Sequence, residues 1–130
     1  MKFFVLIAQV VLGLYFLYNG YNHFRNRAMM AGYAQMRGVP APQHLWVVVT
    51  GIMHLGAGLS LLLGYRVVIG AWLAIIFLVL AAYFVHHYWT EQGMERGGQQ
   101  ANFLKNLALA AALLLVTYLP ANVWTIALGP

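Results

Sequence analysis

Hydrophobic positions form four long runs without a formal charge, at residues 3–24, 38–65, 67–90 and 106–130. A helix needs roughly 20 residues to cross a hydrocarbon core of about 30 Å, and each run contains a segment of that length. Inside lipid a single segment satisfies its backbone hydrogen bonds only as a helix. The pattern therefore predicts an all-α, four-helix transmembrane bundle, with spans at about residues 3–21, 44–63, 67–88 and 102–119.

The connections between the spans differ in length. The link Gly64-Tyr65-Arg66 is so short that the second and third spans must be antiparallel neighbours. Residues 28–36, closed by Gly38-Val39-Pro40, predict a short amphipathic helix that lies at the interface or folds back over the bundle. Residues 91–100 are polar and contain glycine, which is typical of an exposed loop. We expect a single domain over residues 1–130.

Composition supports a membrane protein. Charged residues make up 7% of the chain and hydrophobic residues 63%, whereas about a quarter of the residues of a soluble domain are charged. The net charge of +5 reflects the scarcity of acidic residues, so it does not indicate a nucleic-acid partner. The absence of cysteine excludes disulfides and thiolate metal sites. The expected partners are the lipid bilayer and other membrane subunits or further copies of this chain.

The basic residues are distributed unequally between the two sides of the predicted bundle. Lys2 and Arg66 flank the side of the termini, whereas the side of the two longer loops carries Arg25, Arg27, Arg37, Arg96 and Lys105. Cytoplasmic loops carry an excess of basic residues. The long loops are therefore expected in the cytoplasm and the termini on the outer side.

Polar and small residues recur at helical spacing within the spans and predict the buried faces. A polar group within a span is a candidate for function, because its desolvation costs free energy unless it finds a partner. The predicted faces are Gln9, Gly13, Phe16, Gly20 and His23 in the first span, Thr50, His54 and Gly58 in the second, Trp72, Ile75, Val79, Ala82 and His86 in the third, and Asn106, Ala110 and Thr117 in the fourth.

The long-loop half of the bundle is expected to hold a pocket for a small amphipathic molecule. The candidate ligand-binding residues at that end are Asn19, His23, Thr50, His54, His86 and Asn106. Phe16, Tyr83 and Trp89 are available as walls, and the first loop as a cover. A neutral His54 can donate one hydrogen bond and accept another, which suits a quinone carbonyl and equally suits Thr50 or Asn106.

Other roles are open for these residues, from hydrogen bonding between helices to the ligation of haem or a metal ion. A buried His or Asn often only joins helices through a hydrogen bond worth about 0.6 kcal/mol. Haem would need two histidines at matching depth on facing helices. It is disfavoured because His54 is expected to lie deeper than His23 and His86. A metal site is also disfavoured, because the acidic side chains available to it lie in a loop beside Arg96; its ligands would be His86, His87, Glu91 and Glu95. We assign no metal ligand and no catalytic residue, since no nucleophile–base pair or phosphate-binding glycine loop occurs.

At several of these positions the sequence resembles the DoxX family of small four-helix membrane proteins. Gly13, Phe16 and Gly20 match its Gly-x-x-Phe-x-x-x-Gly pattern, and Gly38-Val39-Pro40 its turn before the second helix. Glycines at 51, 58 and 64 fit its second helix, and residues 103–109 its fourth. Many members carry Glu at about the position of His54, so this chain keeps a proton-exchanging group there but lacks the carboxylate.

The resemblance implies a four-helix protein of the bacterial inner membrane, in a family associated with quinol oxidation, thiosulfate:quinone oxidoreduction and membrane redox complexes. The leading hypothesis is a non-catalytic accessory subunit, or a small bundle that binds a lipid or quinone, within a membrane redox or respiratory complex. The alternative is a quinone-reactive subunit in which His54 and His23 exchange protons with the quinone headgroup. A small-solute transporter is the third hypothesis.

Overall fold

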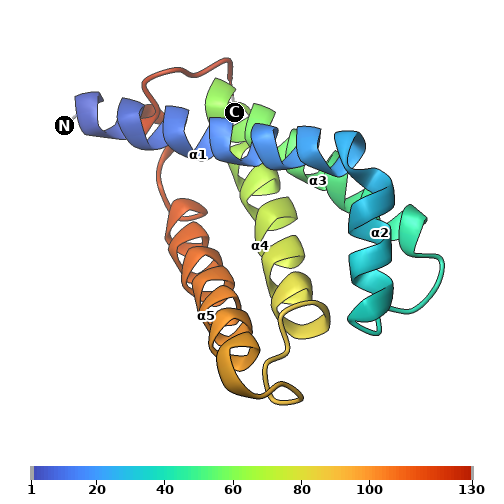
Figure 1. Ribbon diagram of the computed structural model, residues 1–130. Coiled ribbons are helices and arrows are strands. Elements are labelled where there is room, and N and C mark those ends of the chain that lie inside the picture. Colours follow the sequence, from blue (N-terminus) through green and yellow to red (C-terminus); the bar gives the residue numbers. More distant parts are fainter. Residues whose placement is uncertain (1, 130) are drawn as a thin grey trace.

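The structure is a computed structural model that describes residues 2–129, and these residues form helices without any strand (Figure 1). An isolated bridge joins Tyr65 and Gly129. The four long helices are those expected for the bundle, and a short helix stands between the first two of them, as predicted. The helices are α1 (Lys2–Arg25), α2 (Arg27–Met36), α3 (Gln43–Leu63), α4 (Val67–Phe84) and α5 (Gly93–Val116), followed by a 3-10 turn at Ala121–Val123.

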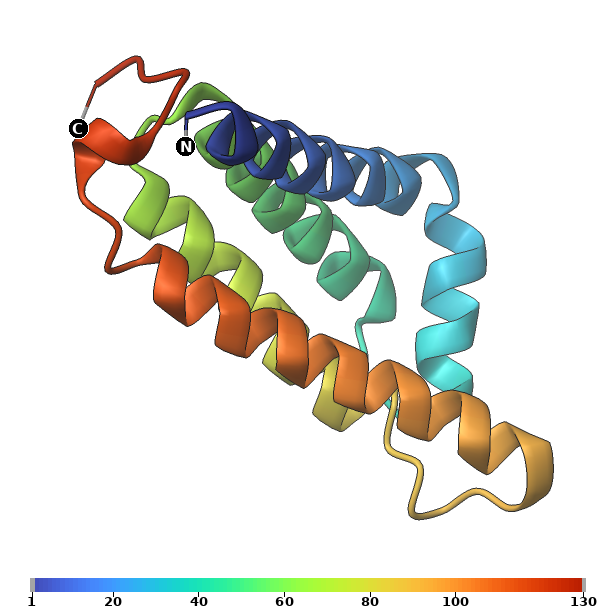
Figure 2. The ribbon, with the colours of Figure 1, turned by 90° about the vertical axis from the view of Figure 1, so that its left-hand side faces the viewer.

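The long helices are arranged in the order α1, α3, α4, α5. Helix α3 packs against both α1 and α4, and α4 packs against α5. Helix α2 leaves the end of α1 at a steep angle and contacts α3 (Figures 1 and 2). The first turns of α1 and the segment after α5 lie at the opposite end of the bundle from α2 (Figure 2). The loops around α2 and between α4 and α5 therefore share one end of the bundle.

Three of the long helices, α1, α3 and α4, are long and apolar enough to cross a membrane. Helix α5, with 24 residues, is long enough as well, but its first turns contain Glu95, Arg96 and several glycines and glutamines. Its second half is apolar. The predicted fourth span at about residues 102–119 therefore corresponds to the apolar second half of a longer helix, which has polar first turns and ends at Val116.

Several predicted boundaries differ from the structure, most clearly those of α4 and α5. Helix α4 ends at Phe84 rather than at residue 88, and the amides of Val85 and His86 both donate to the carbonyl oxygen of Ala81. Helix α5 begins at Gly93, inside the segment predicted to be a loop. Its polarity was misleading because a helix that extends beyond the apolar part of a bundle carries polar residues, and Glu95 in its first turn complements the helix dipole.

The buried face was predicted correctly for α1 except at the half-buried His23, and in part for α3 and α5. Gln9, Gly13, Phe16 and Gly20 are buried on α1, His54 and Gly58 on α3, and Asn106 and Ala110 on α5. The prediction for α4 was wrong at Trp72 and Val79, which are 46% and 43% exposed. The predicted residues Ile75 and Ala82 are buried, and α4 packs through them together with Gly70, Ala71, Ala74, Leu78 and Ala81.

Glycines bring the backbones of α1 and α3 into direct contact. A Cβ atom at Gly58 would lie 2.7 Å from the backbone nitrogen of Leu17 and 2.9 Å from the carbonyl oxygen of Gly13. At Gly13 a Cβ atom would lie 2.6 Å from the Cβ of Leu62. Small residues allow this close packing between membrane helices, where dispersion contacts and not the hydrophobic effect hold the pair together.

The buried polar side chain of Gln9 ties the segment after α5 to the start of the bundle. Its Nε2 donates to the carbonyl oxygens of Leu62 at 3.2 Å and Ile126 at 2.7 Å. Its Oε1 accepts from the backbone amide of Ile126 at 3.2 Å, and the amide of Leu128 donates to the carbonyl of Leu63 at 3.0 Å. Gln9 therefore satisfies backbone groups at the end of the bundle opposite α2. Its role is structural, and it takes no part in the candidate site.

The contact between α1 and α3 predicts opposite effects for two glycine substitutions. Gly58→Ala should lower the free energy of unfolding by about 1–3 kcal/mol, because the neighbouring atoms belong to the backbone of α1 and must move. Gly32→Ala is the matched control, since nothing lies within 4 Å of an added Cβ in α2. It should be neutral or stabilising by up to about 1 kcal/mol. Thermal unfolding of both variants in the same detergent measures the difference, and equal stabilities would contradict the assigned contact.

Candidate functional site

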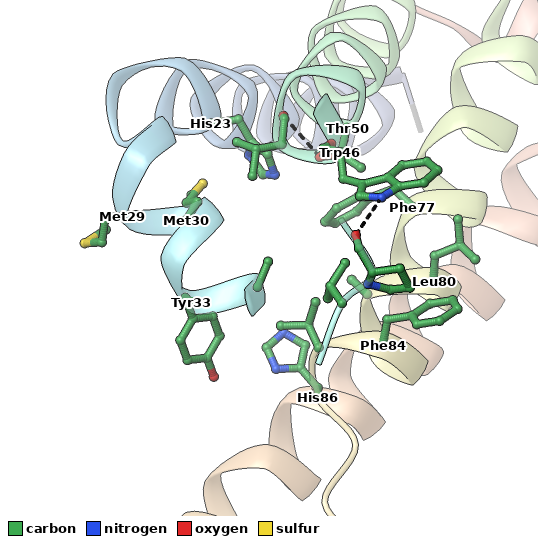
Figure 3. A pocket seen from close by; sticks show the side chains of 16 residues that line it. His23, Met29, Met30, Tyr33, Trp46, Thr50, Phe77, Leu80, Phe84 and His86 are labelled. Carbon is green, nitrogen blue, oxygen red and sulfur yellow. Dashed lines mark hydrogen bonds between the residues drawn. The ribbon is translucent and has the colours of Figure 1, made fainter. Parts of the chain in front are cut away.

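A cavity of about 620 Å³ lies at the long-loop end of the bundle, between α2, the last turn of α1, the first turns of α3 and the end of α4 (Figure 3). Apolar side chains make up most of its wall, among them Met30, Trp46, Phe77, Leu80 and Phe84. Pockets of this size and apolar character are typical sites for small molecules. The side chains of α2 form one wall, so the helix between the first two spans covers this end of the bundle.

The cavity brings together some of the predicted site residues. His23, Thr50 and His86 line it. Figure 3 shows His23 and His86 at different ends of the wall, with apolar side chains between them. His54 lies directly behind His23, with ring centroids 4.7 Å apart, and its ring is 4.0 Å from that of Phe77.

Asn19 and Asn106 are not among the lining residues. The side-chain amide of Asn19 donates to the carbonyl of Tyr15 at 2.8 Å, so this residue reaches the site only through its own carbonyl group. Asn106 is buried on α5 with 6% of its surface exposed. The six predicted residues therefore separate into a group around the cavity and two asparagines outside its lining.

The aromatic wall also differs from the prediction. Phe16 is fully buried and its ring centroid lies 5.8 Å from that of His54, so it packs behind the site. Tyr83 and Trp89 are 60% and 50% exposed and do not line the cavity. The structure instead places four other aromatic side chains in the wall, one from α2, one from α3 and two from α4: Tyr33, Trp46, Phe77 and Phe84.

The adjacent histidines contradict the expectation that His54 lies well below His23. Gly51 explains the difference, because a Cβ atom there would lie 2.9 Å from the Cβ of His23. The side chain of His23 thus crosses α3 at Gly51, one turn from His54, and its ring meets the ring of His54. Helix α1 also continues to Arg25, beyond the predicted end of the first span.

Backbone hydrogen bonds fix the orientation of both rings. The Nδ1 of His23 donates to the carbonyl of Asn19, and the Nδ1 of His54 to the carbonyl of Thr50, each at 2.8 Å. The hydroxyl of Thr50 donates to the carbonyl of Trp46 at 2.7 Å. Each bond stays within one helix, so His54 contacts α1 and α4 through ring packing and not through the interhelical hydrogen bond considered from the sequence.

A cluster of hydrogen-bonded polar side chains joins three parts of the chain at the end of the cavity opposite His23. The Nδ1 of His86 is 2.9 Å from the Oε1 of Gln99. The Nε2 of Gln99 donates to the hydroxyl of Tyr33 at 2.7 Å and to Glu95 at 2.8 Å. Burial lowers the pKa of His86, which favours its neutral form. Sequence reasoning missed Gln99 because it lies in the segment predicted to be a loop; its spacing of seven residues from Asn106 was the available signal.

Arg37 fastens the end of α2 to the segment after α4. Its guanidinium donates to the carbonyls of Val85 at 2.7 Å and His87 at 2.6 Å and forms an ion pair with Glu91 at 2.5 Å. Only 9% of the Arg37 side chain is exposed. Because Glu91 pairs with Arg37 and Glu95 with Gln99, the acidic side chains are committed to these contacts. Within residues 2–129 no group of three His, Asp or Glu side chains is placed to hold a metal ion.

The fold and the cavity define a helical integral membrane protein, and comparisons with known proteins identify its family. The sequence model of the DoxX family matches residues 4–87, from α1 to the segment after α4. The chain is also 30% identical over 112 residues to the inner membrane protein YphA of Escherichia coli (strain K12), and the alignment covers 86% of this chain and 79% of the relative. No solved structure gave a significant match. This protein belongs to the DoxX family.

The Arg37 contacts predict an order of stability among two variants. Arg37→Met should destabilise the protein by about 1.5–3 kcal/mol, because it leaves two backbone carbonyls without a charged donor. Glu91→Gln should have a smaller effect, since the carbonyl contacts remain. Thermal unfolding in one detergent at pH 7 tests this order.

The pH dependence of the melting temperature tests the contribution of the ion pair between Arg37 and Glu91 separately from the carbonyl contacts of Arg37. The Arg37 guanidinium lowers the pKa of Glu91 below its ordinary value of 4.5. The stabilisation by the pair is thus complete above pH 4.5 and is lost as the pH falls through the lower pKa of the folded state. Wild type and Glu91→Gln should converge in melting temperature only as the pH falls below the lowered pKa of Glu91, and a constant difference down to still lower pH would contradict the assignment.

Proposed function

We propose that this protein is a non-catalytic, accessory membrane protein that holds a small lipophilic molecule with a polar head in the cavity beside α2. The observation that carries the proposal is the cavity of about 620 Å³ with apolar walls and few, oriented polar groups. An apolar wall provides affinity for the body of such a molecule, and a few polar groups fix the position of its head.

The geometry suggests how the molecule would lie. Its head would meet His23 and Thr50, beneath which the ring of His54 is packed against Phe77. Its apolar body would extend along α4 toward Phe84, and Met30 of α2 would cover it. The contacts of Arg37 hold α2 in this position, so they would keep the molecule enclosed.

A quinone-reactive subunit of a membrane redox complex is the second candidate. The adjacent rings of His23 and His54 favour it, because imidazole exchanges protons near neutral pH and two such rings lie 4.7 Å apart at the cavity. In that case the partner would be a redox subunit that supplies or removes electrons. Identification of the small molecules and proteins that are purified with this chain distinguishes the two candidates.

We also propose that the long loops face the cytoplasm of a bacterial inner membrane, with both ends of the chain outside. The basic residues near α2 and α5 support this orientation. A phosphatase that is active only outside the cytoplasm should be active when fused to the C-terminus. The same phosphatase should be inactive when it replaces the chain after Gln92, in the link between α4 and α5. The reverse pattern of activities would contradict the orientation.

Filling the cavity tests the ligand-binding proposal. Ala34 lines the cavity from α2, so Ala34→Trp should displace most of the retained molecule while leaving the bundle contacts intact. The neighbouring Gln35 is exposed and does not line the cavity, so Gln35→Trp is the matched control and should retain it. The measurement is mass spectrometry of organic extracts from equal amounts of the purified proteins. Equal contents in the two variants would refute the proposed site.

A further inference from the structure

The hydrogen-bond donors at the His23 end of the cavity are all engaged by the protein itself. His23 donates through Nδ1 to Asn19, and Thr50 donates through its hydroxyl to Trp46. The indole Nε1 of Trp46 donates to the carbonyl of Pro40 at 3.1 Å. Behind them, His54 donates through Nδ1 to the carbonyl of Thr50. A ligand head at this end of the cavity therefore finds no side-chain donor that is free among the described residues.

Hydrogen-bond acceptors remain at the same place. A carbonyl oxygen only accepts, so the Nδ1 atoms of His23 and His54 must carry the proton of each neutral ring, and Nε2 is left with its lone pair. Neither Nε2 is hydrogen-bonded to another residue within 2–129. The hydroxyl oxygen of Thr50 also retains lone pairs. The two Nε2 atoms could both donate only if both rings were protonated. Two positively charged rings with centroids 4.7 Å apart would repel each other, so the two Nε2 atoms do not both act as donors.

The remaining polar groups of the lining lie at the other end. His86 is engaged by Gln99. The hydroxyl of Tyr33 accepts from Gln99 and keeps its own proton, so it is a donor. Figure 3 shows this hydroxyl far from His23 and directed away from it. The two ends of the cavity therefore differ, and the side chains at the His23 and Thr50 end offer only acceptors.

We infer that the cavity selects lipophilic molecules whose head donates a hydrogen bond, such as phenols and fatty alcohols, over ketones, ethers, esters and oxidised quinones. This inference rests on the proposed ligand-binding function and specifies the ligand class for the same site. A hydroxyl head donates a hydrogen bond to the Nε2 of His23 or to the hydroxyl oxygen of Thr50. A head that only accepts faces lone pairs and loses its hydrogen bonds to water without replacement, which sites use to reject molecules.

A matched pair of probes tests this selection. Para-octylphenol and its methyl ether share the apolar body and differ in the single donor. The full-length protein in detergent micelles should retain the phenol roughly 3- to 10-fold more tightly than the ether, as expected for one hydrogen bond. Retention is measured by equilibrium dialysis against protein-free micelles, so that partition of each probe into detergent is subtracted.

Variants locate the preference within the chain. His23→Phe and Thr50→Val each remove an acceptor and should lower the ratio between phenol and ether toward one. His44→Phe makes the same chemical change at an exposed position that does not line the cavity, and it should keep the wild-type ratio. Thr50→Val conserves the shape of the side chain, so it decides the question if His23→Phe does not fold.

The outcomes separate this inference from the proposed function. Equal retention of both probes, or a preference that persists in both cavity variants, overturns the inference and leaves ligand binding intact. Retention of neither probe above the micelle background overturns the proposed function and the inference with it. A preference that is lost in His23→Phe or Thr50→Val and kept in His44→Phe supports both.

Discussion

The close contact between the backbones of α1 and α3 is the constraint on which the rest of the structure depends. Glycines at 13, 20, 51 and 58 remove the side chains that would separate the two helices. This contact lets the side chain of His23 cross α3 at Gly51 and reach His54. A wider separation would leave each of these polar rings without its neighbour, so the same glycines that stabilise the bundle also build the polar end of the cavity.

The cavity arises where the tight pair of helices gives way to α2 and α4. Helix α2 bends away from α1, and Arg37 holds its far end against the segment after α4. Gln99 of α5 joins the same assembly through His86 and Tyr33. Polar groups thus sit at the ends of the space, and apolar side chains form its length. This division is what an amphipathic ligand requires, since its head and its body are recognised by different groups.

The errors of prediction have a common physical origin. In α4 nearly every residue is apolar, so polarity does not distinguish the packed face from the face toward lipid, and the small residues Ala71, Ala74 and Ala81 proved to be the packed ones. At the start of α5 the polar residues were taken as a loop, although a helix outside the apolar region is polar as well. Periodicity was reliable in α1, where polar Gln9 and the glycines contrast with their apolar neighbours.

By itself the sequence determined the class of protein, the approximate positions of the long helices, the short helix between the first two, most of the buried face of α1 and part of that of α3. It did so because charge-free length and the spacing of small and polar residues are local properties of a chain. Only the tertiary structure decided which polar residues line the cavity, since His23, Thr50 and His86 come from three separate segments. It also decided that Asn19 and Asn106 lie outside the cavity lining and that Arg37 and Gln99 close its far side, because the rotation and crossing of whole helices set those distances.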